Sequence, residues 1–568
     1  MKYSYIYRIR FISIGIFIFA LLLIGRLYIL QIVKNENYTN KADRQYSSSA
    51  NKIFSRGNIY FQNRDKTLVS AATLKSGFII AINPEILVNP EDVHSKLNNI
   101  IPVDRDVFIA KASKKNDPYE EIATHVDEEL GKKISDLNIK GLQAYKERWR
   151  FYPGGATASH LLGILGYKGD EYAGRYGLER QYESLLERKD GAYVNFFAEM
   201  FSDIKAAASP NAENEGDVVT TIEPTVQTYF QSVLASTTEK WSSEMTGGII
   251  MDPMTGEIFA METYPTFDPN RPEEQKSAKI FSNPLVENVY EMGSIIKPLT
   301  IAAGINEGVI TSKSTYYDAG FVMISGKKVS NFDGKERGVV NMQDVLSQSL
   351  NVGAAYVEKL LGNKRFANYM FAYGLDEKTG IELPNEAKDL VSNLRTGVDI
   401  DFASASFGQG IALTPVATIR AISTIANGGY LINPHIVKKI NYKIGVSEET
   451  PISLGKQVLK TETAEEVARM MTYSVDKVLS NGSLSLPNYS VAAKTGTAQI
   501  AKAGGGGYSE DRFIHTFVGF FPSYKPRFIV FLYTVNPKGA SFGSETLTHP
   551  YIDIVKFLIN YYEIPPDR

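Results

Sequence analysis

The chain begins with an almost uninterrupted apolar run from Phe11 to Val33, in which Arg26 is the only charged residue. About 20 apolar residues cross the hydrocarbon core of a bilayer as a helix. A buried soluble helix and a cleaved signal peptide fit less well, because helices apolar on every side are rarely soluble and no small-residue cleavage site ends the run. The pattern therefore predicts an uncleaved membrane anchor.

Beyond this run the pattern becomes mixed. A polar stretch at 35–55 leads into short alternating runs such as Ser76–Ile82, which predict strands, and polar runs such as Asp117–Leu137, which predict helices. The mixture continues to about Phe201. The polar segment Asp203–Asp217, rich in Ala, Pro and Asn, then predicts a linker.

The remaining sequence predicts strands, then helices, then strands and a final helix. This order is typical of an α+β domain with an antiparallel sheet. Helical patterns fill 295–430, and Gly504–Gly507 predicts a mobile loop. The other expected elements are a strand at Val218–Ile222, a helix at Thr225–Trp241, strands at Gly247–Met251 and Glu257–Thr263 joined by a tight turn, strands at Phe513–Phe521 and Arg527–Val535, and a helix at Tyr551–Tyr562.

Composition narrows the chemistry further. With 43% hydrophobic and 22% charged residues, the chain is typical of folded protein, and its net charge of -2 gives no sign of a nucleic-acid partner. It has no cysteine, which excludes disulfides, thiolate metal sites and a cysteine nucleophile. The six histidines are scattered without the spacing of a metal motif, so no metal or cofactor is expected.

A hydroxyl and an amine stand three residues apart in Ser294-Ile295-Ile296-Lys297. Positions three apart share a face of a helix, so Lys297 is expected one turn from Ser294. A serine becomes a nucleophile when a neighbouring base removes its proton, and an amine is such a base when its pKa is lowered. Pro298 favours a helix start here. Alone, this motif is more often a chance match on a solvated helix.

Ser349-Leu350-Asn351 is the second motif. Alone it predicts an ordinary polar bend or helix cap. As part of a site, the Ser349 hydroxyl can relay a proton between a base and a leaving group, and the Asn351 amide can hold a substrate carbonyl.

The third motif is Lys494-Thr495-Gly496-Thr497, which follows a strand-like lead-in. A strand edge presents N–H groups to an extended peptide, and Gly496 lets that peptide approach closely. Thr495 and Thr497 can bind a terminal carboxylate, while Lys494 supplies positive potential. The bland interpretation is an edge strand that carries a lysine against aggregation.

The order of the three motifs is close to that of penicillin-binding proteins and class A β-lactamases, with S-x-N in place of S-D-N. Longer segments make the chain similar to class B penicillin-binding proteins. Asp252–Asn270 and Phe407–Asn433 resemble segments of their transpeptidase domain. Three blocks resemble motifs of their N-terminal module: Arg56–Tyr60 with Asp65, Arg150–Pro153 with His160–Gly163, and Gly177–Glu179 with Tyr182.

The resemblance implies a cytoplasmic tail and transmembrane anchor at 1–34, an elongated pedestal or dimerisation-like module at 35–205, and a penicillin-binding transpeptidase domain at 206–568. That domain would contain a five-stranded antiparallel sheet flanked by helices. The catalytic domain would lie outside the plasma membrane, on the periplasmic or other extracytoplasmic side.

The resemblance also implies roles for the motif residues. Ser294 would be the acylated nucleophile and Lys297 its base. Ser349 and Asn351 would be the proton relay and the substrate holder. Lys494, Thr495 and Thr497 would bind a carboxylate beside Gly496, and the N–H groups of Ser294 and Thr497 would form an oxyanion hole.

These roles predict a D,D-transpeptidase that cross-links peptidoglycan stem peptides and is inhibited by β-lactams. A septal enzyme of cell division is favoured over an elongation enzyme of the lateral wall. A β-lactamase, a β-lactam sensor and a scaffold with dispensable catalysis are rival interpretations of the same motifs. A polytopic glycosyltransferase and other divisome or elongation proteins are the expected protein partners.

Overall fold

The computed structural model describes residues 54–169, 171–188, 215–395, 397–452, 455–482, 485–502 and 507–568. The predicted anchor, most of the predicted linker and most of the glycine-rich loop lie outside these ranges. Among the helices that the described ranges contain, none is long and apolar enough to cross a membrane. The described residues form two compact units, the smaller around Leu74–Trp149 and the larger from Arg56–Thr73, Arg150–Glu187 and the C-terminal part.

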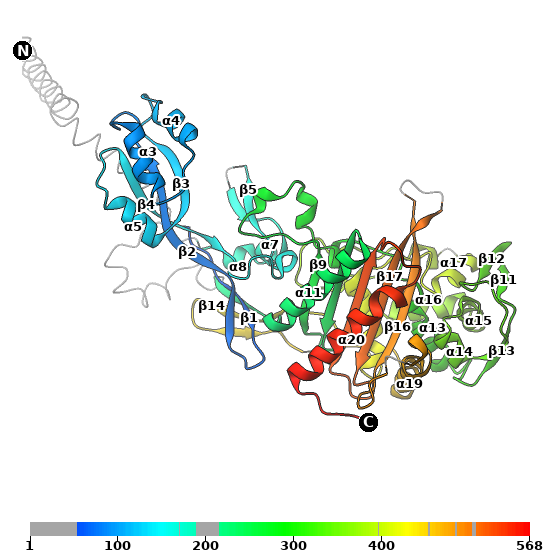
Figure 1. The fold of residues 1–568 in the computed structure, drawn as a ribbon. Coiled ribbons are helices and arrows are strands. Elements are labelled where there is room, and N and C mark those ends of the chain that lie inside the picture. Colours follow the sequence, from blue (N-terminus) through cyan, green and yellow to red (C-terminus); the bar gives the residue numbers. More distant parts are fainter. Residues whose placement is uncertain are drawn as a thin grey trace, which may run out of the picture. The chain divides into compact units, whose positions relative to one another are not determined.

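The smaller unit contains a sheet of three strands and three helices (Figure 1). The strand β2 (Leu68–Ile82) pairs with β3 (Glu120–Asp127) and with β4 (Leu142–Phe151), and the helices are α3 (Pro90–Asn98), α4 (Arg105–Ala112) and α5 (Glu128–Ser135). Phe78, Ile80, Leu97, Phe108 and Ile134 lie in its core.

One prediction for this unit is confirmed and one is wrong. The predicted strand Ser76–Ile82 lies within β2. The predicted helix Asp117–Leu137 is a strand over its first half, β3, and becomes helical only in α5. Val126 is the only fully buried residue of β3, so the strand shows almost no alternating apolar pattern and depends on its pairing with β2.

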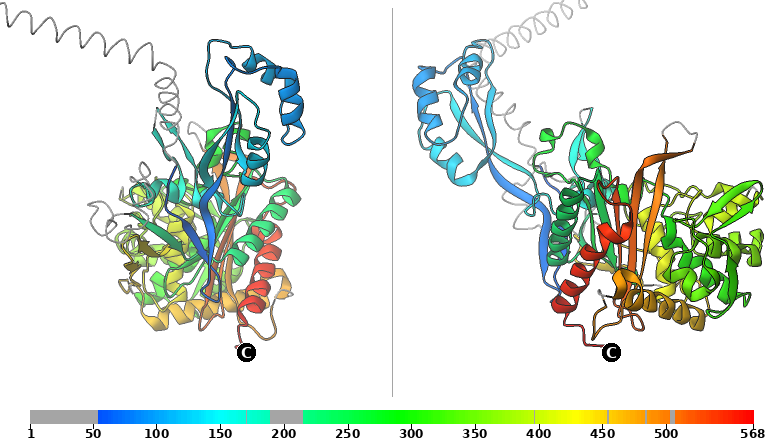
Figure 2. Two further views of the ribbon diagram at one scale, coloured as in Figure 1. Left: turned by 90° about the vertical axis from the view of Figure 1, so that its left-hand side faces the viewer. Right: turned by 45° about the vertical axis from the view of Figure 1, so that its right-hand side comes forward.

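The larger unit is built on a five-stranded antiparallel sheet (Figure 2). Its strand order is β16 (Ala492–Ala501), β17 (Tyr508–Phe521), β18 (Phe528–Val535), β8 (Met245–Met251) and β9 (Ile258–Tyr264). The four strands predicted at 247–251, 257–263, 513–521 and 527–535 all lie within this sheet apart from single end residues, so the prediction of an α+β domain is confirmed.

The sheet lies between two helical layers. In β18, Phe528, Val530 and Leu532 contact one layer, whereas Ile529 and Phe531 contact the other, as period-two alternation requires. The first layer is α11 (Pro224–Trp241) and α20 (Gly543–Tyr562), which cross the same face side by side (Figure 1). The second layer is the helical region that contains α13 (Lys297–Asn306) and α18 (Pro415–Ala426).

The final helix is longer than predicted. The sequence predicts a start at Tyr551, directly after Pro550, but α20 begins at Gly543 and contains Pro550 in its interior. Proline removes one intrahelical hydrogen bond. The buried residues Leu547, Tyr551 and Val555 follow the helical period on both sides of the proline and pack in one hydrophobic cluster, which offsets that loss.

Other elements complete the larger unit. The strands β15, β14, β7, β1 and the start of β2 are neighbours in that order. The predicted strand Val218–Ile222 overlaps β7. The bounds are β1 (Ile59–Gln62), β5 (Leu165–Lys168), β6 (Glu171–Gly174), β7 (Gly216–Thr220), β10 (Thr315–Asp318), β11 (Phe321–Ile324), β12 (Lys327–Ser330), β13 (Gly338–Asn341), β14 (Val437–Tyr442) and β15 (Ser447–Glu449), with α6 (Ser159–Leu162), α7 (Gly177–Gln181), α8 (Glu183–Leu186), α12 (Pro284–Glu287), α14 (Met342–Ser347), α15 (Asn351–Leu361), α16 (Asn363–Ala372), α17 (Asp399–Ala405) and α19 (Thr461–Lys477).

A buried ion-pair network joins the three sequence blocks of the N-terminal module. Glu179 Oε2 accepts a hydrogen bond from Arg56 Nε and Glu179 Oε1 accepts one from Arg150 Nε, each at 2.6 Å. Tyr152 OH donates to Glu179 Oε1 at 3.2 Å. Burial alone would raise the pKa of Glu179, but the two guanidinium groups outweigh it and lower the pKa below 4.5. The blocks therefore meet at one point within the larger unit.

Candidate active site

Ser294 lies at the start of a helix, as predicted. It is the second residue of the 3₁₀ turn η5 (Gly293–Ile296), which continues directly into α13. The local reason is a tight approach to β16: Gly293 has φ 62°, and a Cβ added there would lie 2.8 Å from the Thr497 carbonyl oxygen. Pro298 lies in the first turn of α13, where a missing N–H costs little.

Lys297 contacts three oxygens through its amine. Its Nζ lies 2.9 Å from Ser294 Oγ, 2.5 Å from the Ser349 carbonyl oxygen and 3.1 Å from Ser349 Oγ. A neutral amine has two N–H donors and one lone pair. It can therefore donate to both oxygens of Ser349 while its lone pair accepts the hydrogen of the Ser294 hydroxyl, so the three contacts suit a base poised on Ser294.

The surroundings of Lys297 favour that neutral form. The side chain is fully buried, with 0% exposure. Burial, and after it the positive charge of Lys494, lowers the pKa of Lys297 well below 10.5. Burial also lowers the pKa of Lys494, to about 7. The two amines are thus held near each other in an apolar setting where both cannot easily be charged.

The second motif lies in the connection between α14 and α15. Ser349 has φ 59°, a left-handed conformation that is uncommon outside glycine, and this turn brings its hydroxyl between the two lysines. Lys494 Nζ donates to Ser349 Oγ at 3.0 Å. Asn351 begins α15, lines the same cleft and donates from Nδ2 to the Ser330 carbonyl oxygen at 2.9 Å.

The third motif lies on β16, an outer strand of the five-stranded sheet within the described residues. Lys494 Nζ also donates to the Thr495 carbonyl oxygen at 2.9 Å, and Thr497 Oγ1 accepts from Gly543 N–H at 3.0 Å. Thr497 therefore keeps its own hydroxyl hydrogen for another acceptor. A Cβ added at Gly496 would lie 2.8 Å from the Met292 carbonyl oxygen, so η5 packs closely against this strand.

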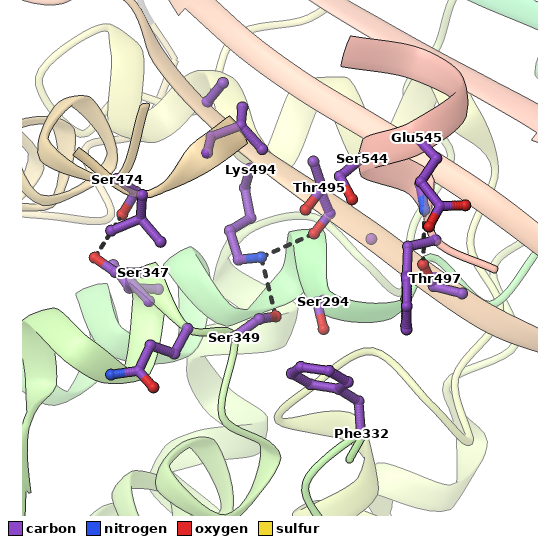
Figure 3. Close-up of a pocket in the computed structure, with 18 of the residues that line it drawn as sticks. Ser294, Phe332, Ser347, Ser349, Ser474, Lys494, Thr495, Thr497, Ser544 and Glu545 are labelled. Atoms are coloured by element: carbon purple, nitrogen blue, oxygen red, sulfur yellow. Dashed lines mark hydrogen bonds between the residues drawn. The ribbon is translucent and has the colours of Figure 1, made fainter. Parts of the chain in front are cut away.

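All eight residues singled out by the sequence are brought to one place. Seven of them line a cleft of about 1040 Å³, and Lys297 lies beneath it in contact with Ser294. Figure 3 shows Ser294, Ser349 and Lys494 turned toward the same space. The pattern that predicts this is local for Ser294 and Lys297, but the contact of Lys494 with Ser349 joins residues 145 positions apart.

The structure adds cleft residues that no sequence pattern marks. Phe332 follows β12, and Phe542 and Glu545 belong to the start of α20. The rings of Phe332 and Phe542 meet edge to face with centroids 5.7 Å apart. Ser347 and Ser474 also line the cleft, with hydroxyl oxygens 3.0 Å apart. All five lie outside the three motifs.

The described residues contain no group of three or more His, Cys, Asp or Glu side chains that could hold a metal ion. His515 is fully buried on β17, where Nδ1 lies 3.0 Å from Thr546 Oγ1. Burial lowers its pKa to about 4, so it is neutral at physiological pH. Within the described part of the chain, the polar groups near Ser294 are hydroxyls, amides and amines.

Comparison with known families identifies the class of protein. The model described as penicillin binding protein transpeptidase domain matches residues 246–553, more than half of the chain. The model of the penicillin-binding protein dimerisation domain matches residues 54–206. The chain belongs to the penicillin-binding protein transpeptidase family, with the dimerisation domain preceding the transpeptidase domain.

Individual relatives agree with this assignment along nearly the whole chain. Stage V sporulation protein D of Bacillus subtilis is 28% identical over 556 residues, covering 95% of this chain and 83% of that protein. Peptidoglycan D,D-transpeptidase FtsI of Buchnera aphidicola is 25% identical over 569 residues, covering 98% and 96%. The crystal structure of penicillin-binding protein 3 from Mycobacterium tuberculosis with aztreonam has a TM-score of 0.69 at 23% identity, covering 91% and 98%, and shows the shared fold.

Proposed function

We propose that this chain is a serine D,D-transpeptidase that cross-links peptidoglycan stem peptides and is acylated by β-lactams. The observation that carries the proposal is the 2.9 Å contact between the buried amine of Lys297 and the hydroxyl of Ser294. A lysine with a strongly lowered pKa beside a serine at a helix start is an activated nucleophile.

In the first half-reaction, Ser294 Oγ attacks the carbonyl carbon of the D-Ala–D-Ala bond, and its proton passes to Lys297 Nζ. The N–H groups of Ser294 and Thr497 hold the oxyanion, because η5 keeps these two backbones close. The C–N bond then breaks. The leaving D-alanine takes a proton through Ser349, while Lys494, Thr495 and Thr497 hold its carboxylate and Asn351 holds the peptide.

In the second half-reaction, an amine of a neighbouring stem peptide attacks the ester on Ser294. A C–N bond forms and the C–Oγ bond breaks. The amine proton returns through the lysine and hydroxyl network to Ser294 Oγ, so the enzyme is regenerated without any cofactor.

Labelled penicillin tests the proposal directly. The protein is expected to form a stable adduct on Ser294, and Ser294→Ala is expected to abolish labelling. Ser347→Ala is the matched control, because Ser347 lines the same cleft and its hydroxyl is paired with Ser474 instead of Lys297. Persistent labelling of Ser294→Ala would refute the assignment, and rapid turnover of penicillin would favour a β-lactamase.

We further place the enzyme in the plasma membrane, anchored by the apolar run at 11–33 with the catalytic domain on the outer side. The large translocated domain suits a substrate that lies outside the membrane, and a polytopic glycosyltransferase is the expected partner. A protease added to intact spheroplasts should digest the catalytic domain. Protection from that protease would contradict this placement.

A septal role is favoured over an elongation role, since several relatives carry the name FtsI. Wall synthesis during sporulation is the second candidate, because a relative aligned over 95% of this chain is a stage V sporulation protein. A fluorescent fusion imaged through growth and development would separate the three roles: mid-cell, lateral wall or forespore. A lateral distribution would overturn the septal assignment.

A further inference from the structure

A second, smaller groove continues the catalytic cleft. It has a volume of about 270 Å³ and lies between α11 and α20, where Lys240, Trp241 and Asp553 line it. Glu545 and His549 line both the groove and the cleft. These two residues are four apart on α20 and therefore share one face of the helix. The space around Ser294 thus extends past Glu545 toward α11.

Glu545 is held in position at this junction. Its Oε2 accepts a hydrogen bond from Ser541 N–H at 2.9 Å, and the side chain is exposed to solvent. Two residues earlier, Gly543 N–H donates to Thr497 Oγ1, so the start of α20 is fixed to β16. Figure 3 shows Glu545 beside Thr497 on the same side of the cleft.

The charges in the cleft are few and of opposite sign at different places. Among the described residues that line the cleft, Lys494 is the one lysine and Glu545 is the one carboxylate. Under the function proposed above, the substrate also has two kinds of charge. The donor peptide ends in a carboxylate, and each stem peptide carries the amine used for cross-linking, since donor and acceptor strands are copies of one polymer.

We propose that Glu545 is a specificity-determining residue that binds the ammonium group of a stem peptide where the cleft meets the α11–α20 groove. The ammonium belongs either to the donor, whose reacting end then lies at Ser294, or to the acceptor before its amine loses a proton and attacks the ester. The chemistry of recognition is the same in both cases, an exposed carboxylate facing a primary ammonium. This inference rests on the proposed transpeptidase function.

Two synthetic peptides separate the charge from the rest of the donor. Both end in D-Ala–D-Ala, and the preceding residue is lysine in one and norleucine in the other. Glu545→Gln keeps the acceptor for Ser541 N–H and removes only the charge. If the donor binds Glu545, this variant loses roughly two- to fivefold in kcat/KM for D-alanine release from the lysine peptide, with the norleucine peptide unchanged.

The acceptor is tested with the norleucine peptide as donor and a lysine-containing peptide without D-alanine as the amine. If the acceptor binds Glu545, Glu545→Gln lowers the ratio of aminolysis to hydrolysis of the acyl-enzyme, again roughly two- to fivefold. Salt at about 0.5 M should shrink either difference. A loss in one arm assigns the ammonium to that peptide.

The matched control is Glu462→Gln, an exposed carboxylate in the first turn of α19 that does not line the cleft. The proposal is overturned if Glu545→Gln leaves both arms unchanged, or if Glu462→Gln produces the same loss. Penicillin labelling of every variant at Ser294 is measured alongside. If the unmodified protein is neither labelled nor able to release D-alanine, the transpeptidase function itself fails, which is a different result.

Discussion

Lys297 Nζ and Ser294 Oγ are 2.9 Å apart, with the lysine wholly buried. Replacement of the amine by a thioether of similar length, Lys297→Met, removes the base and retains the volume. General-base catalysis contributes about 10²–10⁴-fold, so the rate of acylation by penicillin is expected to fall by about 10³-fold. Stopped-flow labelling measures this rate.

The folded state of Lys297→Met is expected to persist, because loss of the amine's hydrogen bonds is offset by removal of a buried polar group. Lys359→Met, an exposed change on α15, is the control. An acylation rate within about threefold of the original in a folded Lys297→Met variant would contradict the role of Lys297 as base.

The two lysines predict a bell-shaped pH dependence of acylation. The rate should rise with pH as Lys297 loses its proton, since its pKa is lowered, and should fall above pH about 7 as Lys494 loses its charge. The limbs belong to the interacting pair. Lys494→Arg keeps a positive charge at all accessible pH values, so the alkaline limb should disappear from the profile of acylation rate against pH.

The complementary variant is Lys494→Met, which removes the positive neighbour of Lys297. Because that charge lowers the pKa of Lys297, the acidic limb should move to higher pH. An acidic limb that moves to lower pH, or does not move, would show that the two amines do not interact.

Gly293 tests the approach of η5 to β16. A Cβ there would meet the Thr497 carbonyl oxygen at 2.8 Å, so Gly293→Ala should displace the N–H of Ser294 from that of Thr497 and slow acylation by about 100-fold, the scale of losing one oxyanion donor. Gly308→Ala is the matched control: its φ is also positive, 71°, but nothing lies within 4 Å. Equal effects of both substitutions would assign the loss to backbone strain alone.

Glu358 on α15 is a buried carboxyl whose Oε1 has no hydrogen-bond partner among the described residues. Burial, and after it the charge of Asp399, raises its pKa from 4.5 to about 7. Between these pH values the unfolded chain releases a proton that the folded chain keeps, so the free energy of unfolding falls as pH rises.

Glu358→Gln removes this penalty. It should raise the free energy of unfolding by ~2 kcal/mol at pH 8 and change it little at pH 4, as measured by urea denaturation. Glu465→Gln, an exposed change on α19, should have no such effect. A variant equally stable to the original protein at pH 8 would mean that Glu358 is not held in its neutral form.

The sequence predicts the sheet and the site well where the signal is carried by neighbouring positions. Phe528–Val535 alternates apolar contacts on both faces, and Ser294 with Lys297 is a single helical turn, so both follow from local rules. Family resemblance supplied the meeting of Lys494 with Ser349, which no local pattern encodes.

The errors arise where tertiary contacts decide. Glu120–Asp127 is polar and becomes a strand because β2 offers it a partner, and Pro550 is accepted inside α20 because Leu547 and Tyr551 pack in the same cluster. Phe332 and Glu545 reach the cleft from a connection after β12 and from a helix start, where nothing in the neighbouring sequence marks them.

Ser349 Oγ receives a hydrogen bond from each of two amines, at 3.1 Å from Lys297 and 3.0 Å from Lys494. A hydroxyl has two lone pairs and a single hydrogen. With both lone pairs engaged, that hydrogen can rotate only toward the open side. The direction of proton delivery is thereby fixed before any peptide arrives, and a departing amine meets a donor that is already aligned.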